Sequence, residues 1–236
     1  MGKIKLLIFY VGGTLIDFHS LIIRGNAKVL KKFWKIDAKE KQIKSIIDKL
    51  DLGLTNFCDD YLHFRQTDLA YQKILEYYGI PISEARKFSN MMDKNIDWKK
   101  LKLYPDSMIA LKKLQGKYFL ATLSNIHDSI IHKKNLDKTK LKNNFHLHID
   151  SQSFGIRKPS PHIFKTVLDH FQVKPHEAVM IGDTPSADIF GAKKLGIHSI
   201  LINRRRLSYN FNKFTRPEHE IFSLKQLPKI LQKFEK

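Results

Sequence analysis

The sequence predicts an α/β protein in which a doubly wound parallel sheet receives an all-helical insertion directly after its first strand. Short apolar runs alternate with helical patterns before residue 17 and again after about residue 100, which is typical of a parallel sheet flanked by helices. Between residues 18 and 95, apolar residues repeat at helical spacing and no strand pattern occurs. The strand-like runs end at glycine, serine or aspartate, so polar groups are expected along the carboxyl edge of the sheet.

The first predicted strand is Leu6–Val11, an unbroken apolar run that ends at Gly12 and Gly13. Continuous β-rich runs are typical of strands that are buried on both faces. The two glycines allow a sharp turn and a close approach of backbone N–H groups to an anion. Taken alone, this stretch is equally typical of an ordinary buried strand and turn.

The insertion is predicted to form a separate unit of amphipathic helices. Its predicted segments are Ala27–Trp34, Ile43–Leu50, a helix capped by Thr55 that holds Phe57, Tyr61 and Phe64, Tyr71–Tyr78 ended by Gly79, and a helix capped by Ser83 that holds Ala85, Phe88 and Met92. The predicted boundaries follow from these patterns: residues 1–17 and 96–236 form the α/β core, and residues 18–95 form the helical unit.

Strands and helices alternate in the remainder of the chain. The predicted order is a helix capped by Asp106 that reaches Leu114, a strand Tyr118–Leu123, a helix Ser129–Asn135, a strand Leu147–Asp150, a helix begun by Ser160 and Pro161, a strand Val179–Gly182, a helix Ser186–Leu195 stopped by Gly196, a strand Ser199–Ile202, and a last helix after the capping box Ser223–Gln226. Parallel strands in this order place their ligands at the strand carboxyl ends.

The chain is strongly basic, with 42 Lys and Arg against 23 Asp and Glu and a formal charge of +19. This balance favours anionic ligands and weak, salt-sensitive contact with nucleic acid. The basic residues are scattered apart from Arg204–Arg206, and they form no zinc-finger, RNA-recognition or helix-turn-helix signature. We therefore expect no specific nucleic-acid partner, and a monomer or a homodimer.

Two further features bear on the surroundings in which the protein works. No segment approaches the roughly 20 apolar residues that span a bilayer, so no membrane partner is expected. Cys58 is the single cysteine, which rules out an intrachain disulfide. We expect a reducing, cytoplasmic location.

Four segments carry the polar residues that follow the predicted strands. They are LLIFYVGGTLID at residues 6–17, Ser124-Asn125, the loop GIRKPSPHIF at residues 155–164, and MIGDTPSADIFGAKKLGI at residues 180–197. In this order and spacing they closely resemble the four motifs of the haloacid dehalogenase (HAD) superfamily. The resemblance covers nearly the whole chain, and the last two motifs are long and specific. It implies a hydrolase with a Rossmann-like core and a helical cap.

The resemblance also implies a role for each matching position. Position 10 would be the nucleophilic aspartate and position 12 the aspartate that acts as general acid and base; Ser124 would bind phosphoryl oxygens; Lys158 would neutralise phosphate charge; Asp183 and Asp188 would form the Mg²⁺ site; Gly13, Thr14 and Asn125 would contact the phosphate. Such a set suits phosphoryl transfer, which depends on positioning and charge neutralisation. Taken singly, Ser124, Lys158 and Asp183 could instead be a helix cap, a solvated lysine and another helix cap.

The first motif departs from the family pattern, because Tyr10 and Gly12 stand where the two aspartates are expected. A phenol is neutral near pH 7, with an ordinary pKa of about 10, and it is a poor Mg²⁺ ligand. Loss of a covalent nucleophile costs about a millionfold in a protease. Mg²⁺ binding is therefore expected to be weak or absent.

Two function classes follow from these residues. The first is a phosphatase-type hydrolase of a small phosphorylated metabolite, with reduced or lost activity. The second is a catalytically inactive relative that binds an anionic ligand or a partner.

Overall fold

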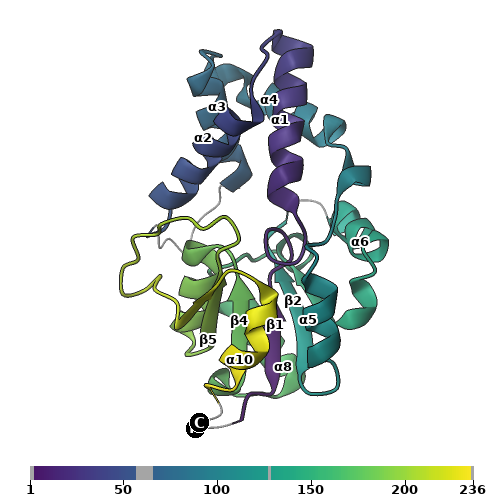
Figure 1. Ribbon diagram of the computed structural model, residues 1–236, viewed down its shortest axis with the longest axis vertical. Helices are drawn as coiled ribbons and strands as arrows, with labels where there is room; N and C mark the ends of the chain where they lie inside the picture. Colours follow the sequence, from purple (N-terminus) through teal and green to yellow (C-terminus); the bar gives the residue numbers. More distant parts are fainter. Residues whose placement is uncertain (1–2, 57–65, 127–128, 235–236) are drawn as a thin grey trace. The chain divides into compact units, whose positions relative to one another are not determined.

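The computed structural model describes residues 3–56, 66–126 and 129–234, which separate into two compact units (Figure 1). The core unit holds the chain up to Asp17, residues 55 and 56, and the chain from Lys102 onward. The cap unit holds Phe18–Leu54 and the later helices up to Leu101. The chain thus returns to the core after Leu101, whereas the sequence pattern placed this boundary near residue 96.

Among the described residues of the core unit, one six-stranded sheet is present in the order β3-β2-β1-β4-β5-β6, and every neighbouring pair is parallel. Its strands are β1 (Leu6–Phe9), β2 (Phe119–Ser124), β3 (Leu147–Asp150), β4 (Ala178–Gly182), β5 (His198–Ile202) and β6 (His219–Ile221). The prediction of a doubly wound parallel sheet is confirmed. β6 was not predicted, because three residues are too few to show a pattern.

The central position of β1 determines where a ligand site can lie. β1 pairs with β2 on one side and with β4 on the other, so the strand order reverses here. Phe9, the last residue of β1, is level with Thr122 and Ile181 on its two neighbours. Ligands of open α/β sheets bind at such a point, beyond the carboxyl ends of the strands.

Helices cover the sheet of the core unit (Figure 1). They are α5 (Ser107–Leu114), α6 (Ser129–Lys138), α7 (Ser151–Phe154), α8 (Pro161–Phe171), α9 (Phe190–Lys194) and α10 (Leu227–Leu231). The apolar face of α8, including Phe164 and Val167, is fully buried in the cluster formed with β1, β2 and β4. Complete burial of such side chains contributes about 1.5–3 kcal/mol each.

Two helix starts in the core differ from the prediction. The helix expected from Ser186 begins as a π-helical turn, Pro185–Ile189, and α9 continues it from Phe190. Such wide turns occur often at functional sites. Asp106 precedes α5 but makes no capping hydrogen bond, because its carboxylate is used by Arg204, Ser223 and Leu224.

The cap unit contains α1 (Phe18–Trp34), α2 (Glu40–Gly53), α3 (Gln66–Tyr77) and α4 (Ala85–Asn95), and no strand occurs in its described part. Phe88 is buried between the rings of Trp34 and Tyr71. Phe33, predicted on the apolar face of α1, is 39% exposed. Ser83 lies inside a 3₁₀ turn, so α4 begins after it.

Two other predictions concern the segment around residues 57–64 and the absence of a membrane-spanning helix. The helix expected around Phe57, Tyr61 and Phe64 falls outside the described residues, as does Cys58. In the ranges that are described, no helix has the length and apolar character required to cross a membrane.

Candidate active site

The carboxyl edge of the sheet brings together residues that are far apart in the sequence. Tyr10 extends β1, and its N–H donates to the Ile181 carbonyl of β4 at 2.9 Å. Ser124 ends β2 and Asp183 follows β4. The Lys158 ammonium lies 4.0 Å from the centre of the Tyr10 ring. These four predicted site residues therefore gather around the end of the central strand.

Lys158 is the buried cation of this edge, with 2% of its surface exposed. Its Nζ donates to the Leu123 carbonyl at 2.7 Å and to Asp188 Oδ1 at 2.6 Å. Burial lowers the pKa of Lys158 and raises the pKa of Asp188, because desolvation penalises both charged forms, and the ion pair between them opposes both shifts. Breaking such a pair is costly, because one buried charge then remains uncompensated.

Asp188 was predicted to support a metal ion, and its carboxylate is occupied in another way. Oδ1 accepts from Lys158, and Oδ2 accepts from the Thr184 N–H at 3.0 Å. A Cβ on Gly182 would fall 2.2 Å from Asp188 Oδ2, so only glycine leaves room for this carboxylate at the end of β4. Both oxygens of Asp188 thus have donors in the described chain, and the carboxylate fixes the lysine.

Asn125 was predicted to contact phosphate, and its amide holds the Lys158 backbone instead. Its Oδ1 accepts from the Lys158 N–H and its Nδ2 donates to the Lys158 carbonyl, both at 2.9 Å. This paired contact joins the end of β2 to the loop that carries the lysine. Asn125 therefore acts by positioning the cation.

The glycine turn after β1 is closed by its own hydrogen bonds. Gly13 adopts φ +76°, and its N–H donates to the Ile16 carbonyl at 2.8 Å. Its N–H is therefore used within the turn, whereas the resemblance implied that it contacts a phosphate. Thr14 is fully buried, and its hydroxyl donates to Asp183 Oδ1 at 3.4 Å.

Ser124 offers a polar atom that is ready for a ligand. The residue is fully buried, and its Oγ has no hydrogen-bond partner within the described chain. An unpaired buried hydroxyl costs about 1–3 kcal/mol. A bound anion oxygen at the end of β2 would remove that cost.

The residues at this edge do not fit a resident Mg²⁺. Mg²⁺ prefers several oxygen ligands in near-octahedral geometry. Position 12 is glycine, position 10 supplies a neutral ring, and Asp188 is paired with Lys158. Two other carboxylates belong to the four motifs: Asp183 accepts from the Thr14 hydroxyl, and Asp17 accepts from the Tyr104 hydroxyl at 3.4 Å. Nowhere in the described ranges do three His, Cys, Asp or Glu gather as a metal site.

Sequence reasoning missed one contributor to this edge, Arg204. The sequence indicates Arg204 only as part of the basic cluster Arg204–Arg206. In the structure its side chain is 11% exposed and donates to the Thr14 carbonyl and to Asp106. The available signal was its position directly after a predicted strand, at the same edge as the other site residues.

Comparisons with known proteins agree with this fold. The family model described as haloacid dehalogenase-like hydrolase matches residues 7–202. (S)-2-haloacid dehalogenase 4A of Burkholderia cepacia is 27% identical, covering 99% of this chain and 97% of the relative. Glyceraldehyde 3-phosphate phosphatase of Pyrococcus furiosus is 24% identical, covering 100% and 95%.

A solved structure supports the fold independently. The magnesium-bound HAD-hydrolase YfnB from Bacillus subtilis superposes with a TM-score of 0.75 at 21% identity, covering 98% of this chain and 99% of that one. The family match, the parallel sheet and the motif residues at its carboxyl edge lead to one conclusion: the chain belongs to the haloacid dehalogenase-like hydrolase family.

Proposed function

We propose that this chain is a phosphatase-type member of the family that binds the phosphate of a small phosphorylated molecule and hydrolyses it very slowly or not at all. One observation carries the proposal: Tyr10 stands at the nucleophile position, and its ring lies against the Lys158 ammonium at 4.0 Å. An aromatic ring in this place stabilises the cation. It does not provide the carboxylate on which phosphoryl transfer in this family depends.

Two features support the binding half of the proposal. Ser124 presents a buried hydroxyl without a partner, and the Lys158 charge lies beneath the same edge. Relatives at similar identity include both phosphatases and dehalogenases. The dehalogenase branch uses the same nucleophile, so a change of reaction class would not restore turnover.

The loss of turnover follows from the protein's own groups. Gly12 has no side chain that could transfer a proton to the leaving oxygen. The three N–H groups of an ammonium face a carbonyl, a carboxylate and the Tyr10 ring, so Lys158 orients its neighbours rather than acting as a mobile acid. Residues that position a phosphate and neutralise its charge remain. The motifs supply neither a nucleophile for the attack nor a residue that transfers a proton.

The test compares the wild type with Ser124→Ala. We expect no Mg²⁺-dependent hydrolysis of p-nitrophenyl phosphate by either protein. Calorimetric titration with inorganic phosphate should show binding to the wild type and at least about tenfold weaker binding to the variant, because a hydrogen bond to a charged group is lost.

The same variant gives a matched stability control. Removing an unpaired buried hydroxyl should leave the thermal midpoint unchanged or raise it, so weaker phosphate binding cannot be assigned to unfolding. Fast hydrolysis by the wild type that Tyr10→Phe abolishes would show instead that Tyr10 is itself the nucleophile. Absence of phosphate binding to the wild type would refute the proposal.

A further inference from the structure

Arg204 follows β5, and each nitrogen of its guanidinium has an acceptor. Nε and Nη2 donate to the Thr14 carbonyl at 2.9 and 2.7 Å. Nη1 and Nη2 donate to the two oxygens of Asp106 at 3.2 and 2.9 Å. The flat face of the group stacks on the Tyr104 ring at 3.8 Å. The planar guanidinium donates to two groups and stacks on one ring, so it is held in a single orientation.

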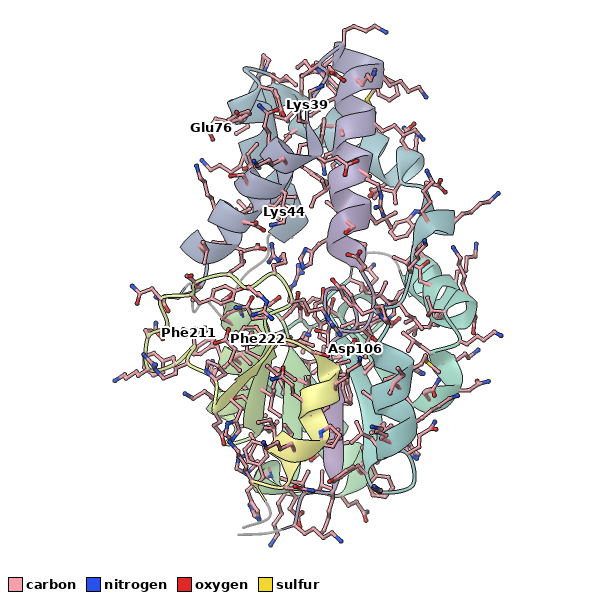
Figure 2. All side chains as sticks on the ribbon, viewed as in Figure 1. Lys39, Lys44, Glu76, Asp106, Phe211 and Phe222 are labelled. Carbon is pink, nitrogen blue, oxygen red and sulfur yellow. The ribbon has the colours of Figure 1, made fainter. Side chains whose placement is uncertain are left out.

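Asp106, labelled in Figure 2, anchors this arginine from a second side. Its carboxylate also accepts from Ser223 Oγ at 2.6 Å and from the Leu224 N–H at 2.9 Å. Burial alone would raise the pKa of Asp106, but the hydrogen bonds from Arg204 and Ser223 and the charge of Arg204 hold it below its ordinary value. The anchor therefore stays ionised, and it connects the start of α5 with the C-terminal segment.

The Thr14 carbonyl, which accepts from Arg204, belongs to the turn after β1. The Thr14 hydroxyl donates to Asp183 Oδ1 at 3.4 Å, so the residue whose carbonyl Arg204 holds also contacts the carboxylate that follows β4. The next carbonyl, Leu15, is held separately by the Ser107 hydroxyl at 2.8 Å and the Tyr104 N–H at 3.0 Å. Two neighbouring carbonyls thus accept from different residues, and Arg204 donates to the carbonyl of Thr14.

We propose that Arg204 is the positioning residue of the turn Gly12–Thr14, holding Thr14 toward Asp183 from the end of β5. The role of that turn in ligand binding rests on the function proposed above, whereas the control of its geometry by Arg204 does not. Lysine cannot replace Arg204, because a single ammonium does not reproduce four directed contacts and a stacked face. The effect should be local, because Ser107 and Tyr104 still hold Leu15.

The experiment measures amide hydrogen exchange by NMR in the wild type, Arg204→Lys and Ser107→Ala. The reporters are the N–H groups of Gly13, Leu15 and Ile16, which are bonded within the turn. In Arg204→Lys we expect these amides to exchange about tenfold faster or more, the factor implied by losing charged hydrogen bonds, while amides of β4 exchange as before. Arg204→Ala extends the series if the lysine variant retains part of the contact.

Three outcomes decide the matter. Unchanged exchange in the turn of both arginine variants would overturn the proposal. A uniform increase across the whole sheet would also overturn it, because it indicates general destabilisation. A local increase in Arg204→Lys that exceeds the increase in Ser107→Ala supports it. Phosphate titration of the same proteins separates the two proposals: a wild type that binds no phosphate refutes the function, while the exchange data still test Arg204.

Discussion

At the scale of single residues, the candidate site joins polar side chains from several strand ends with one aromatic ring. Ser124 ends β2, Asp183 follows β4, and Lys158 is held by a buried pair with Asp188. Tyr10, directly after β1, places its ring against this ammonium. A carboxylate at position 10 would add a negative charge and a nucleophile at the same point, so one substitution tests both.

Rebuilding the first motif should restore a metal site. Tyr10→Asp adds a carboxylate beside Asp183, and we expect Mn²⁺ binding by calorimetry that neither the wild type nor Tyr10→Asn shows. Adding Gly12→Asp should raise phosphate-ester turnover by about 10²–10⁴-fold over the single variant, since a general acid is gained. Recovery should be partial, because misplacement by about 1 Å can cost a hundredfold.

Two results would contradict this expectation. Strong Mn²⁺ binding to the wild type that Asp183→Asn removes would show that the native residues do form a metal site. A double variant that binds Mn²⁺ yet hydrolyses no member of a broad panel of phosphate monoesters would show that more than the first motif has been lost.

At the scale of elements, local sequence signals were most accurate where they were strongest. β3 spans Leu147–Asp150 as predicted, and Gly79 and Gly196 follow their helices with φ of +67° and +73°. The capping box at Ser223 is present. The predicted cap at Asp106 was wrong, because a carboxylate that can bind its own helix also competes for partners brought in by the fold.

Helix α6 carries a histidine that should make stability depend on pH. Burial lowers the pKa of His132 from 6.5 to about 4, with Asp150 opposing and His148 adding to the shift. The folded state keeps the ring neutral while the unfolded chain takes up a proton, so stability is complete above about pH 6.5 and falls as the pH drops toward 4. The loss should be at most about 3 kcal/mol.

Thermal midpoints between these two pH values test this. His132→Phe should flatten the slope, while the exposed His162→Phe should leave it unchanged. If both variants keep the wild-type slope, the pH dependence arises from other groups.

At the scale of the whole molecule, the charge of +19 is spread over both units. Lys39 and Lys44, labelled in Figure 2, belong to the cap unit and pair there with Asp37 and Asp48. In the cluster Arg204–Arg206, Arg204 is paired with Asp106 and Arg206 lies over the Phe222 ring at 4.7 Å. The densest basic stretch of the sequence is therefore partly engaged inside the core unit, which weakens the case for a nucleic-acid surface.

Nucleic-acid binding should accordingly be weak and nonspecific. We expect fluorescence anisotropy with labelled DNA duplexes to show affinity that falls at least about tenfold between roughly 50 and 200 mM salt, with no preference among unrelated sequences. A complex that forms on one sequence and persists at physiological salt would contradict this.

The sequence by itself determined the order of the strands and helices, the helical insertion and the resemblance to the family, because these depend on patterns between near neighbours. Only the tertiary structure decided the side-chain pairings. Arg204 reaches Thr14 across 190 positions, and Lys158 meets Asp188 and the Tyr10 ring. Buried charged and polar groups take the partners that close packing brings to them, and no local pattern encodes which partners those are.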